Sequence, residues 1–295
     1  MTDEAGTSRL PLPQLRGEGE KEGPDPTSSP IVLATIRTLT FAGSVTDGTR
    51  PIAVERPVQV SFGDVPFGVM MLTPADLDDF AYGFSLTEGV IEGPGDVRRV
   101  AVEDTSEGLR LHIDLTGPKL HAHLARKRAL SGRTSCGLCG IEDLSALPRA
   151  TREPGPAPAV PLRAIERALH GLDRHQPLNA ETHAVHGAAW CDFDGAVLHA
   201  REDVGRHNAL DKLVGVLLRA GIDPDEGFVL ITSRASFEMV EKVATFGCRT
   251  LVAISAPTAL ALERAQALDL TLIGIARRDA MTVFHGVERI TTELP

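Results

Sequence analysis

Cysteine is scarce in this sequence, and long apolar runs are missing from it. Four cysteines in 295 residues are too few for a disulfide scaffold, which favours a reducing compartment. The first residues lack the basic start and apolar run of a secretory signal, and no apolar stretch approaches the about 20 residues of a membrane span. We therefore expect a cytoplasmic protein that has no membrane partner.

Positive charge is also in deficit, since 30 Lys and Arg face 40 Asp and Glu and leave a net charge of -10. Such a balance argues against general nucleic-acid binding. Two familiar nucleotide-binding motifs are absent as well, namely the Gly-x-x-x-x-Gly-Lys phosphate loop and the dinucleotide glycine fingerprint. Any local concentration of basic residues is therefore informative.

One such concentration adjoins a cysteine pair. Residues 131–140 read Ser-Gly-Arg-Thr-Ser-Cys-Gly-Leu-Cys-Gly, and residues 119–133 carry five Lys or Arg with no acid. Positive charge near a thiol favours the thiolate, which is the form that attacks sulfur and binds metal. The glycines favour a loop. Cys136 and Cys139 are therefore the candidate catalytic residues.

The spacing of this pair leaves several interpretations open. A zinc site needs four ligands, but a second Cys-x-x-Cys is missing and only His121 and His123 are near. A thioredoxin-like redox pair should open a helix, whereas glycine follows here. A persulfide-carrying cysteine with an assisting neighbour is the third interpretation, and a plain turn is the fourth. Spacing alone does not rank zinc, redox and sulfur transfer.

Composition and periodicity divide the chain into four segments. Residues 1–30 resemble a disordered tail, and 148–161 form a proline-rich connector. Residues 31–147 form an N-terminal α+β part that ends in the basic segment and the cysteine loop. Within it we expect strands at 31–36, 52–60, 65–72, 97–103 and 109–115, and a helix that Thr73 caps and that ends near Gly89.

Residues 162–295 form an α/β domain in which apolar strands alternate with amphipathic helices, as in parallel sheets with crossover helices. After a helix from Leu162, we expect strands at 183–190, 196–200, 228–232, 250–254, 270–275 and 281–284, and helices at 208–219, 236–246 and 258–268.

Ligands of open α/β sheets bind outside the carboxyl ends of the strands. Three predicted strand ends carry hydroxyl or arginine side chains: Ser233, Arg234 and Ser236; Ser255 and Thr258; Arg277 and Arg278. Hydroxyls at helix N-termini and arginine both bind phosphate, although each turn alone is also explained by helix capping. Together the three turns predict a phosphorylated or nucleotide ligand.

Residues 201–213, Arg-Glu-Asp-Val-Gly-Arg-His-Asn-Ala-Leu-Asp-Lys-Leu, form the densest polar cluster. His207 is a candidate acid, base or ligand-binding donor, and otherwise a structural histidine. Asp203 and Asn208 lie where a helix needs caps. His186 falls in an apolar strand, where a hydrogen-bonded core histidine is expected.

Two long segments together, 131–140 and 202–212, resemble the formate dehydrogenase accessory sulfurtransferase family FdhD. Further matches are Phe-Ser-Leu-Thr-Glu-Gly at 84–89, Thr-Ser-Arg-Ala-Ser-Phe-Glu-Met-Val at 232–240 and the run 255–275. The likeness covers about residues 50 to 290. One departure is Val185 before His186-Gly-Ala-Ala, where the family usually has threonine before the histidine.

The resemblance implies a sulfur carrier. It would receive persulfide sulfur from a cysteine desulfurase on Cys136, with Cys139 as partner, and pass it to the molybdenum or tungsten bis(molybdopterin guanine dinucleotide) cofactor. This cofactor, bound as a substrate, is destined for the formate dehydrogenase catalytic subunit. The family's cofactor-binding stretch matches Ile275, Ala276, Arg277, Arg278, Asp279 and Ala280.

The resemblance also implies a homodimer with a cytidine-deaminase-like α/β/α sandwich and an added N-terminal α+β part. The zinc deaminase signature is absent, because Gly187-Ala188 follows His186. We therefore expect no tightly held metal. A cofactor-insertion chaperone that moves no sulfur is the alternative function.

Overall fold

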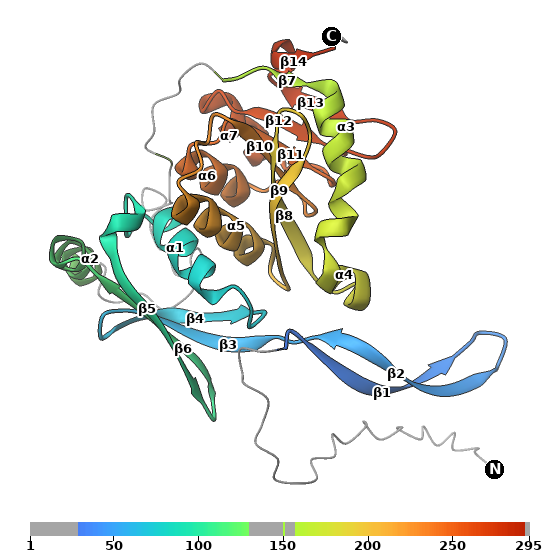
Figure 1. Cartoon of the computed structure of the whole chain (residues 1–295), viewed down its shortest axis with the longest axis horizontal. Helices are drawn as coiled ribbons and strands as arrows, with labels where there is room; N and C mark the ends of the chain where they lie inside the picture. Colours follow the sequence, from blue (N-terminus) through green and yellow to red (C-terminus); the bar gives the residue numbers. More distant parts are fainter. Residues whose placement is uncertain (1–28, 130–149, 151–156, 293–295) are drawn as a thin grey trace, which may run out of the picture.

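The computed structural model describes residues 29–129, 150 and 157–292. The predicted tail, apart from its last residues, lies outside the described residues, as do the Cys136 and Cys139 loop and part of the connector. Figure 1 shows a C-terminal α/β body, a smaller N-terminal sheet beneath it and a two-stranded ribbon that projects sideways.

The body is built on a six-stranded sheet with the order β13-β12-β11-β10-β8-β9. Its central strands β10, β11 and β12 are parallel, as the alternating pattern predicts, while β8, β9 and β13 run antiparallel to their neighbours. The strands are β8 (His186–Asp192), β9 (Val197–Asp203), β10 (Gly227–Ile231), β11 (Thr250–Ala253), β12 (Thr271–Gly274) and β13 (Thr282–His285).

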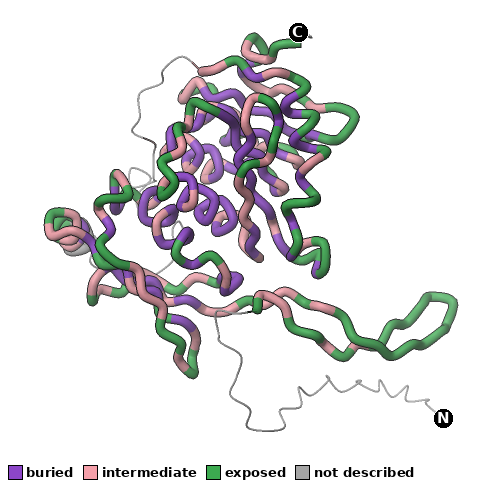
Figure 2. Tube along the Cα trace, in the orientation of Figure 1, coloured by how far each residue is buried: buried purple, intermediate pink, exposed green. Residues whose placement is uncertain are grey.

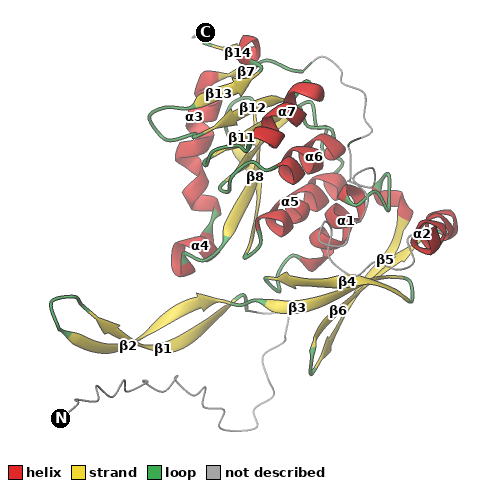
Figure 3. Ribbon diagram, turned by 180° about the vertical axis from the view of Figure 1, so that it is seen from behind, coloured by secondary structure: helices red, strands yellow, loops and turns green. Residues whose placement is uncertain are grey.

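Helices cover both faces of this sheet, as Figures 1 and 3 show from opposite sides. One face carries α5 (Arg206–Ala220), α6 (Phe237–Phe246) and α7 (Ala259–Ala267), and the other carries α3 (Leu162–Gly171). Alternate residues of β10 serve the two faces. Val229 and Ile231 lie in the core on the α5 and α6 side, and Phe228 and Leu230 lie in the core on the α3 side.

The N-terminal part is a four-stranded sheet, order β4-β3-β6-β5, with α1 and α2. Its elements are β3 (Arg56–Phe62), β4 (Val65–Leu72), α1 (Leu77–Thr87), β5 (Val97–Thr105), β6 (Gly108–Leu115) and α2 (Gly117–Ala129). Helix α1 packs on α5, so Phe80 and Phe84 share one core with Leu213 and Val214. The two parts are therefore joined by a continuous apolar core.

The ribbon consists of β1 (Ile31–Leu39) and β2 (Val45–Ala53), which pair only with each other among the described strands. Its outer half is exposed throughout, in contrast to the buried sheet of the body (Figure 2). Phe41 lies in the turn between the two strands and is fully exposed. Strand β2 also contacts α4 (Pro177–Thr182). Short elements complete the chain: η1 (Pro94–Asp96), β7 (Val160–Pro161), η3 (Leu172–His175), η4 (Val287–Arg289) and β14 (Ile290–Thr291).

Several elements differ from the prediction. The single strand expected at 52–60 is divided between β2 and β3, because the chain leaves one sheet and enters another at Val54. Helices α2 and α4 fall in segments for which no helix was predicted. Thr73 does not cap a helix, because α1 begins at Leu77 and the Thr73 hydroxyl accepts a hydrogen bond from the backbone N–H of Val204 at 3.1 Å.

Candidate functional site at the carboxyl edge of the sheet

The three predicted turns lie together at one edge of the sheet. Strands β10, β11 and β12 are parallel neighbours, so their carboxyl ends meet there. Backbone hydrogen bonds join the turns directly, from Ile254 N to Ile231 O at 2.9 Å and from Ile275 N to Ser255 O at 3.1 Å. The edge is therefore a continuous surface of turns and helix N-termini.

The first turn, after β10, presents two buried serines and an exposed arginine. The Ser233 hydroxyl donates to the carbonyl of Arg234 at 3.1 Å, which is a local turn contact. Ser236 is the N-cap residue of α6, yet its side chain makes no capping hydrogen bond. Its Oγ is buried and has no hydrogen-bond partner among the described residues. An unpaired buried hydroxyl costs free energy, so it marks a place where a ligand would be accepted.

The second turn, after β11, is explained more simply. The Thr258 hydroxyl accepts a hydrogen bond from Ala261 N at 3.3 Å and so caps α7. Ser255 is half-buried, and its carbonyl is occupied by Ile275 N. Capping accounts for Thr258 by itself, and its predicted role in ligand binding stays a prediction.

The third turn, after β12, holds its two arginines differently. The backbone N–H of Arg277 bonds Ala280 O at 2.7 Å, and its guanidinium donates to the carbonyl of Ile254 at the end of β11. The Arg278 guanidinium instead pairs with the exposed Asp173 of η3. Only Arg277 therefore lies against the strand ends, whereas the sequence favours an arrangement in which both side chains serve one ligand.

The stretch from Ile275 to Ala280 begins with a sharp turn of the backbone. Ile275 adopts a left-handed conformation with φ of 51°, which turns the chain sharply after β12, and Ala276 beyond it is buried. Asp279 and Ala280 are exposed.

His207 lies at the same edge and connects two helices. The edge also includes the end of β9, whose last residue, Asp203, pairs with His186, the first residue of β8. The His207 Nε2 of α5 lies 2.6 Å from Glu238 Oε2 of α6. The imidazole holds the pKa of the Glu238 carboxyl below its ordinary value, mainly through this close contact. The pair fixes the two helix N-termini side by side.

Further residues of this edge did not enter the predicted site. Arg206, the first residue of α5, has a buried Nε without a partner among the described residues. Gln176 is buried, and its Nε2 is also unpaired there. A Cβ added to Gly187 would lie 2.5 Å from that amide nitrogen, so the glycine makes room for Gln176. His186 is half-buried, and burial lowers its pKa, with Arg206 and His207 adding to the effect.

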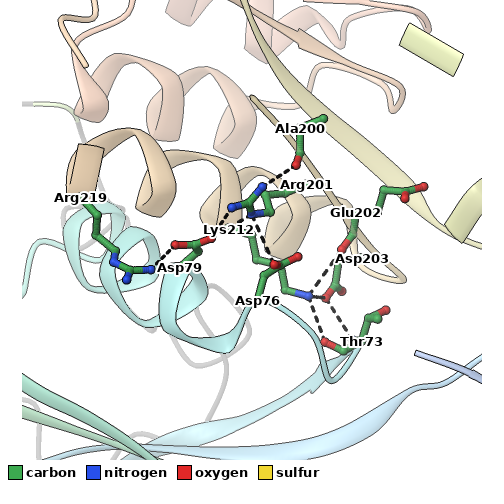
Figure 4. Close-up of polar contacts among 9 residues, drawn as sticks. All are labelled: Thr73, Asp76, Asp79, Ala200, Arg201, Glu202, Asp203, Lys212 and Arg219. Atoms are coloured by element: carbon green, nitrogen blue, oxygen red, sulfur yellow. Dashed lines mark hydrogen bonds and ion pairs between the residues drawn. The ribbon is translucent and has the colours of Figure 1, made fainter. Parts of the chain in front are cut away.

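A buried ion pair lies at the turn that starts α5 (Figure 4). Lys212 Nζ lies 2.6 Å from Asp203 Oδ2, and both side chains are fully buried. The same Asp203 oxygen accepts from Thr73 N at 3.0 Å, and Lys212 donates to Thr73 O at 2.9 Å. Asp203 Oδ1 accepts from Gly205 N at 2.8 Å. Asp203 therefore fixes the turn that starts α5, and ties it to the N-terminal part.

A second ionic cluster lies beside it in Figure 4. Arg201 donates to Asp79 of α1 at 2.7 and 2.8 Å, and Arg219 of α5 contacts the other oxygen of the same carboxylate. The cluster fixes α1 against the body.

The cysteines divide into two classes. Cys136 and Cys139 lie outside the described residues. Cys191 and Cys248 are free and buried, and burial raises the pKa of both thiols, that of Cys248 to about 11. A buried, protonated thiol is a poor nucleophile, so these two do not suit sulfur chemistry.

Neither a metal centre nor a membrane helix is found in the described ranges. His123, a nearby histidine in the zinc interpretation, is buried with its ring centroid 4.9 Å from that of Phe62. The described residues contain no cluster of three or more metal-ligating His, Cys, Asp or Glu. Among them, no helix is long and apolar enough to cross a membrane.

Comparison with known proteins assigns the chain to a family. It is 47% identical over 239 residues to the sulfur carrier protein FdhD of Xanthomonas campestris pv. campestris (strain B100), covering 81% of this chain and 85% of that protein. The FdhD of Bordetella petrii is 43% identical over 250 residues, or 85% and 90% of the two chains. A crystal structure assigned as a formate dehydrogenase accessory protein from Desulfotalea psychrophila has the same fold, with a TM-score of 0.69 at 23% identity over 89% of this chain and all of that one. A sequence model of the FdhD/NarQ family matches residues 53–291, and the chain therefore belongs to the FdhD/NarQ family.

Proposed function

We propose that this protein is a sulfur carrier that serves a formate dehydrogenase. The name of its relatives supports this role, since they share 41–47% identity with it over most of the chain. The Cys-x-x-Cys pair beside five basic residues supplies the thiols that such a role needs. The two other cysteines are buried, which leaves Cys136 and Cys139 as the candidate sulfur carriers.

In the loading step, the Cys136 thiolate attacks the outer sulfur of a persulfide on a cysteine desulfurase, and the desulfurase thiolate leaves. In the delivery step, the Cys139 thiolate attacks the inner sulfur on Cys136. A Cys136–Cys139 disulfide forms, and the outer sulfur leaves as hydrosulfide for the metal of the bound cofactor. A dithiol reductant then restores both thiols.

The acceptor in this proposal is the molybdenum or tungsten bis(molybdopterin guanine dinucleotide) cofactor, held as a substrate before it enters the formate dehydrogenase catalytic subunit. The observation that carries its placement is the convergence of three polar turns at one sheet edge. Arg277 and the unpaired Ser236 hydroxyl are the groups there that fit a nucleotide phosphate.

The proposal extends to the remaining family properties. A sheet with helices on both faces is compatible with a cytidine-deaminase-like sandwich, although the body would perform no deamination. The protein would act as a homodimer in the cytoplasm. These three points rest on the family resemblance.

The test is to incubate the full chain with a cysteine desulfurase and cysteine and to locate added sulfur by mass spectrometry of peptides. We expect one additional sulfur atom on Cys136 of the parent protein and no additional sulfur at this position in Cys136→Ala. Only protein that carries this sulfur should activate a client formate dehydrogenase. Normal client activation by Cys136→Ala would instead favour the alternative, a cofactor-insertion chaperone that moves no sulfur.

A further inference from the structure

Arg206 differs from the other partly buried arginines of the described chain. Five of them pair with a carboxylate within 4 Å: Arg56, Arg201, Arg249, Arg264 and Arg289. Arg206 is also partly buried, but it has no ion pair and no side-chain hydrogen bond to any described residue, and its Nε is fully covered. The charge of Arg206 acts on Glu238 of α6, but no carboxylate of the described residues lies within 4 Å of its guanidinium, so the covered Nε is free to bond an anion.

The surroundings of Arg206 favour an anion further. It opens α5, a helix of 15 residues whose N-cap is Gly205 and whose first turn has no acid. The N-terminus of α6, a helix of 10 residues, is held next to it by the contact of His207 with Glu238. The free N–H groups and dipoles of both helices therefore favour negative charge at this point.

A second, independent observation comes from Ser236. Only 9% of this N-cap residue is exposed, and its Oγ makes neither the expected capping bond nor any other among the described residues. Since a serine N-cap ordinarily bonds its own helix, this hydroxyl is free to bond a ligand group at the N-terminus of α6.

The remaining neighbours are consistent with an occupied site. The carboxylate of Glu238 lies 2.6 Å from His207, and the charge of Arg206 helps to lower its pKa, but it forms no ion pair with Arg206 within 4 Å. His186, on the adjoining strand, has its pKa lowered mainly by burial and also by the charge of Arg206, and its neutral ring can donate or accept a hydrogen bond. On the far side of Gly187, the amide of Gln176 also lacks a partner among the described residues.

This position is separate from that of Arg277. Arg206 follows β9 and Arg277 follows β12, and these strands are four positions apart in the sheet. At about 4.8 Å between strands, the two backbones lie about 19 Å apart along the edge. The two arginines therefore mark different parts of the candidate site.

We propose that Arg206, Ser236 and the N-termini of α5 and α6 bind the diphosphate group of a nucleoside diphosphate moiety. This inference rests on the proposed nucleotide ligand and adds a second anion position to it. Arg206 supplies the bidentate contact, and Ser236 donates from the opposite helix.

The test measures dissociation constants of the full-length protein for pyrophosphate, GDP and guanosine by calorimetry. We expect Arg206→Gln to weaken pyrophosphate and GDP by about tenfold or more, the loss of a charge-assisted contact. Ser236→Ala should weaken both several-fold. Guanosine binding should not change in either variant. Arg163→Gln, on the exposed side of α3, is the matched control and should bind like the parent.

Melting temperatures without ligand establish that each variant is folded. Parental affinity of Arg206→Gln for pyrophosphate and GDP would overturn the inference, as would a parent protein that binds neither. Sulfur loading of Cys136 reports separately on the proposed function. If loading and client activation succeed while Arg206→Gln binds normally, only the diphosphate site is wrong. If Arg206-dependent binding occurs without sulfur loading, only the sulfur-carrier role is wrong.

Discussion

Gly83 of α1 and Gly215 of α5 lie at the crossing of these two helices. A Cβ added to Gly83 would lie 1.7 Å from the backbone oxygen of Asp211, and one added to Gly215 would lie 1.7 Å from that of Asp79. Neither contact can be relieved by a side chain, because both partners are backbone atoms. The close approach of the N-terminal part to the body therefore depends on the absence of two methyl groups.

Gly215→Ala should destabilise the protein strongly, because the helices must separate to admit the methyl group. Overpacking costs about 1–3 kcal/mol, and we expect the upper end or more. Urea unfolding measures the change. Gly95→Ala is the control, since a Cβ there meets nothing within 4 Å. Equal stability of the two variants would show that α1 and α5 adjust freely.

The Asp203 and Lys212 pair should show strong coupling. Lys212→Met removes the cation and leaves a fully buried carboxylate, which costs about 3–5 kcal/mol. Asp203→Asn in the same chain removes that unpaired charge and keeps an oxygen for Gly205 N. The double variant should therefore be more stable than the sum of the single changes predicts. Strict additivity in urea unfolding would contradict this.

The sequence predicts the parts of the fold that depend on local periodicity. The strand expected at 65–72 matches β4 at both ends, and the β–α alternation predicts the ends of β10, β11 and β12 to within one residue. The Ser233, Ser255 and Arg277 turns can therefore be assigned to one edge from the sequence, since parallel strands impose that arrangement.

Contacts between distant segments are beyond the reach of the sequence. Thr73 has the residue type and position of a helix cap, but its hydroxyl and backbone bond residues about 130 positions later. Arg206 stands within the conspicuous polar cluster, yet the covered Nε that lacks a partner among the described residues is a property of the folded chain. Gln176 carries no local signal of any kind.

The four cysteines should react in two classes. In native protein, an alkylating reagent should modify Cys136 and Cys139 and leave Cys191 and Cys248 untouched, because burial covers these thiols and raises their pKa. In denaturant all four should react. Peptide mass spectrometry reads each site, and native labelling of Cys248 at pH 8 would contradict its burial.

Sulfur loading and nucleotide binding should be separable by mutation. Arg277→Ala should weaken GDP binding by about tenfold, while Arg278→Ala should do less, because its guanidinium already pairs with Asp173. Both should load sulfur normally. Arg126→Ala/Lys127→Ala/Arg128→Ala on α2 should load more slowly and bind GDP normally. If all of these variants slow sulfur loading and weaken GDP binding equally, the cysteine loop and the carboxyl edge of the sheet form a single site.

The His207 and Glu238 contact should stabilise the protein above the ordinary carboxyl pKa. Because the folded-state pKa of Glu238 lies below its ordinary value of 4.5, its contribution is present above about pH 4.5 and is lost as pH falls through the folded value. Glu238→Gln should therefore melt below the parent at pH 6, and the difference should shrink as the pH falls below 4.5. A constant difference across this range would exclude ionisation of Glu238 as the cause.

The ribbon of β1 and β2 gives the molecule two levels of protection against hydrogen exchange. Its outer half bonds only to itself among the described strands, so those amides can exchange through local opening while the body stays folded. Amides of β10 and β11, buried between helices, exchange only when much of the body unfolds. A change that weakens the crossing of α1 and α5 would accelerate exchange in the body and leave the ribbon's rate as it was.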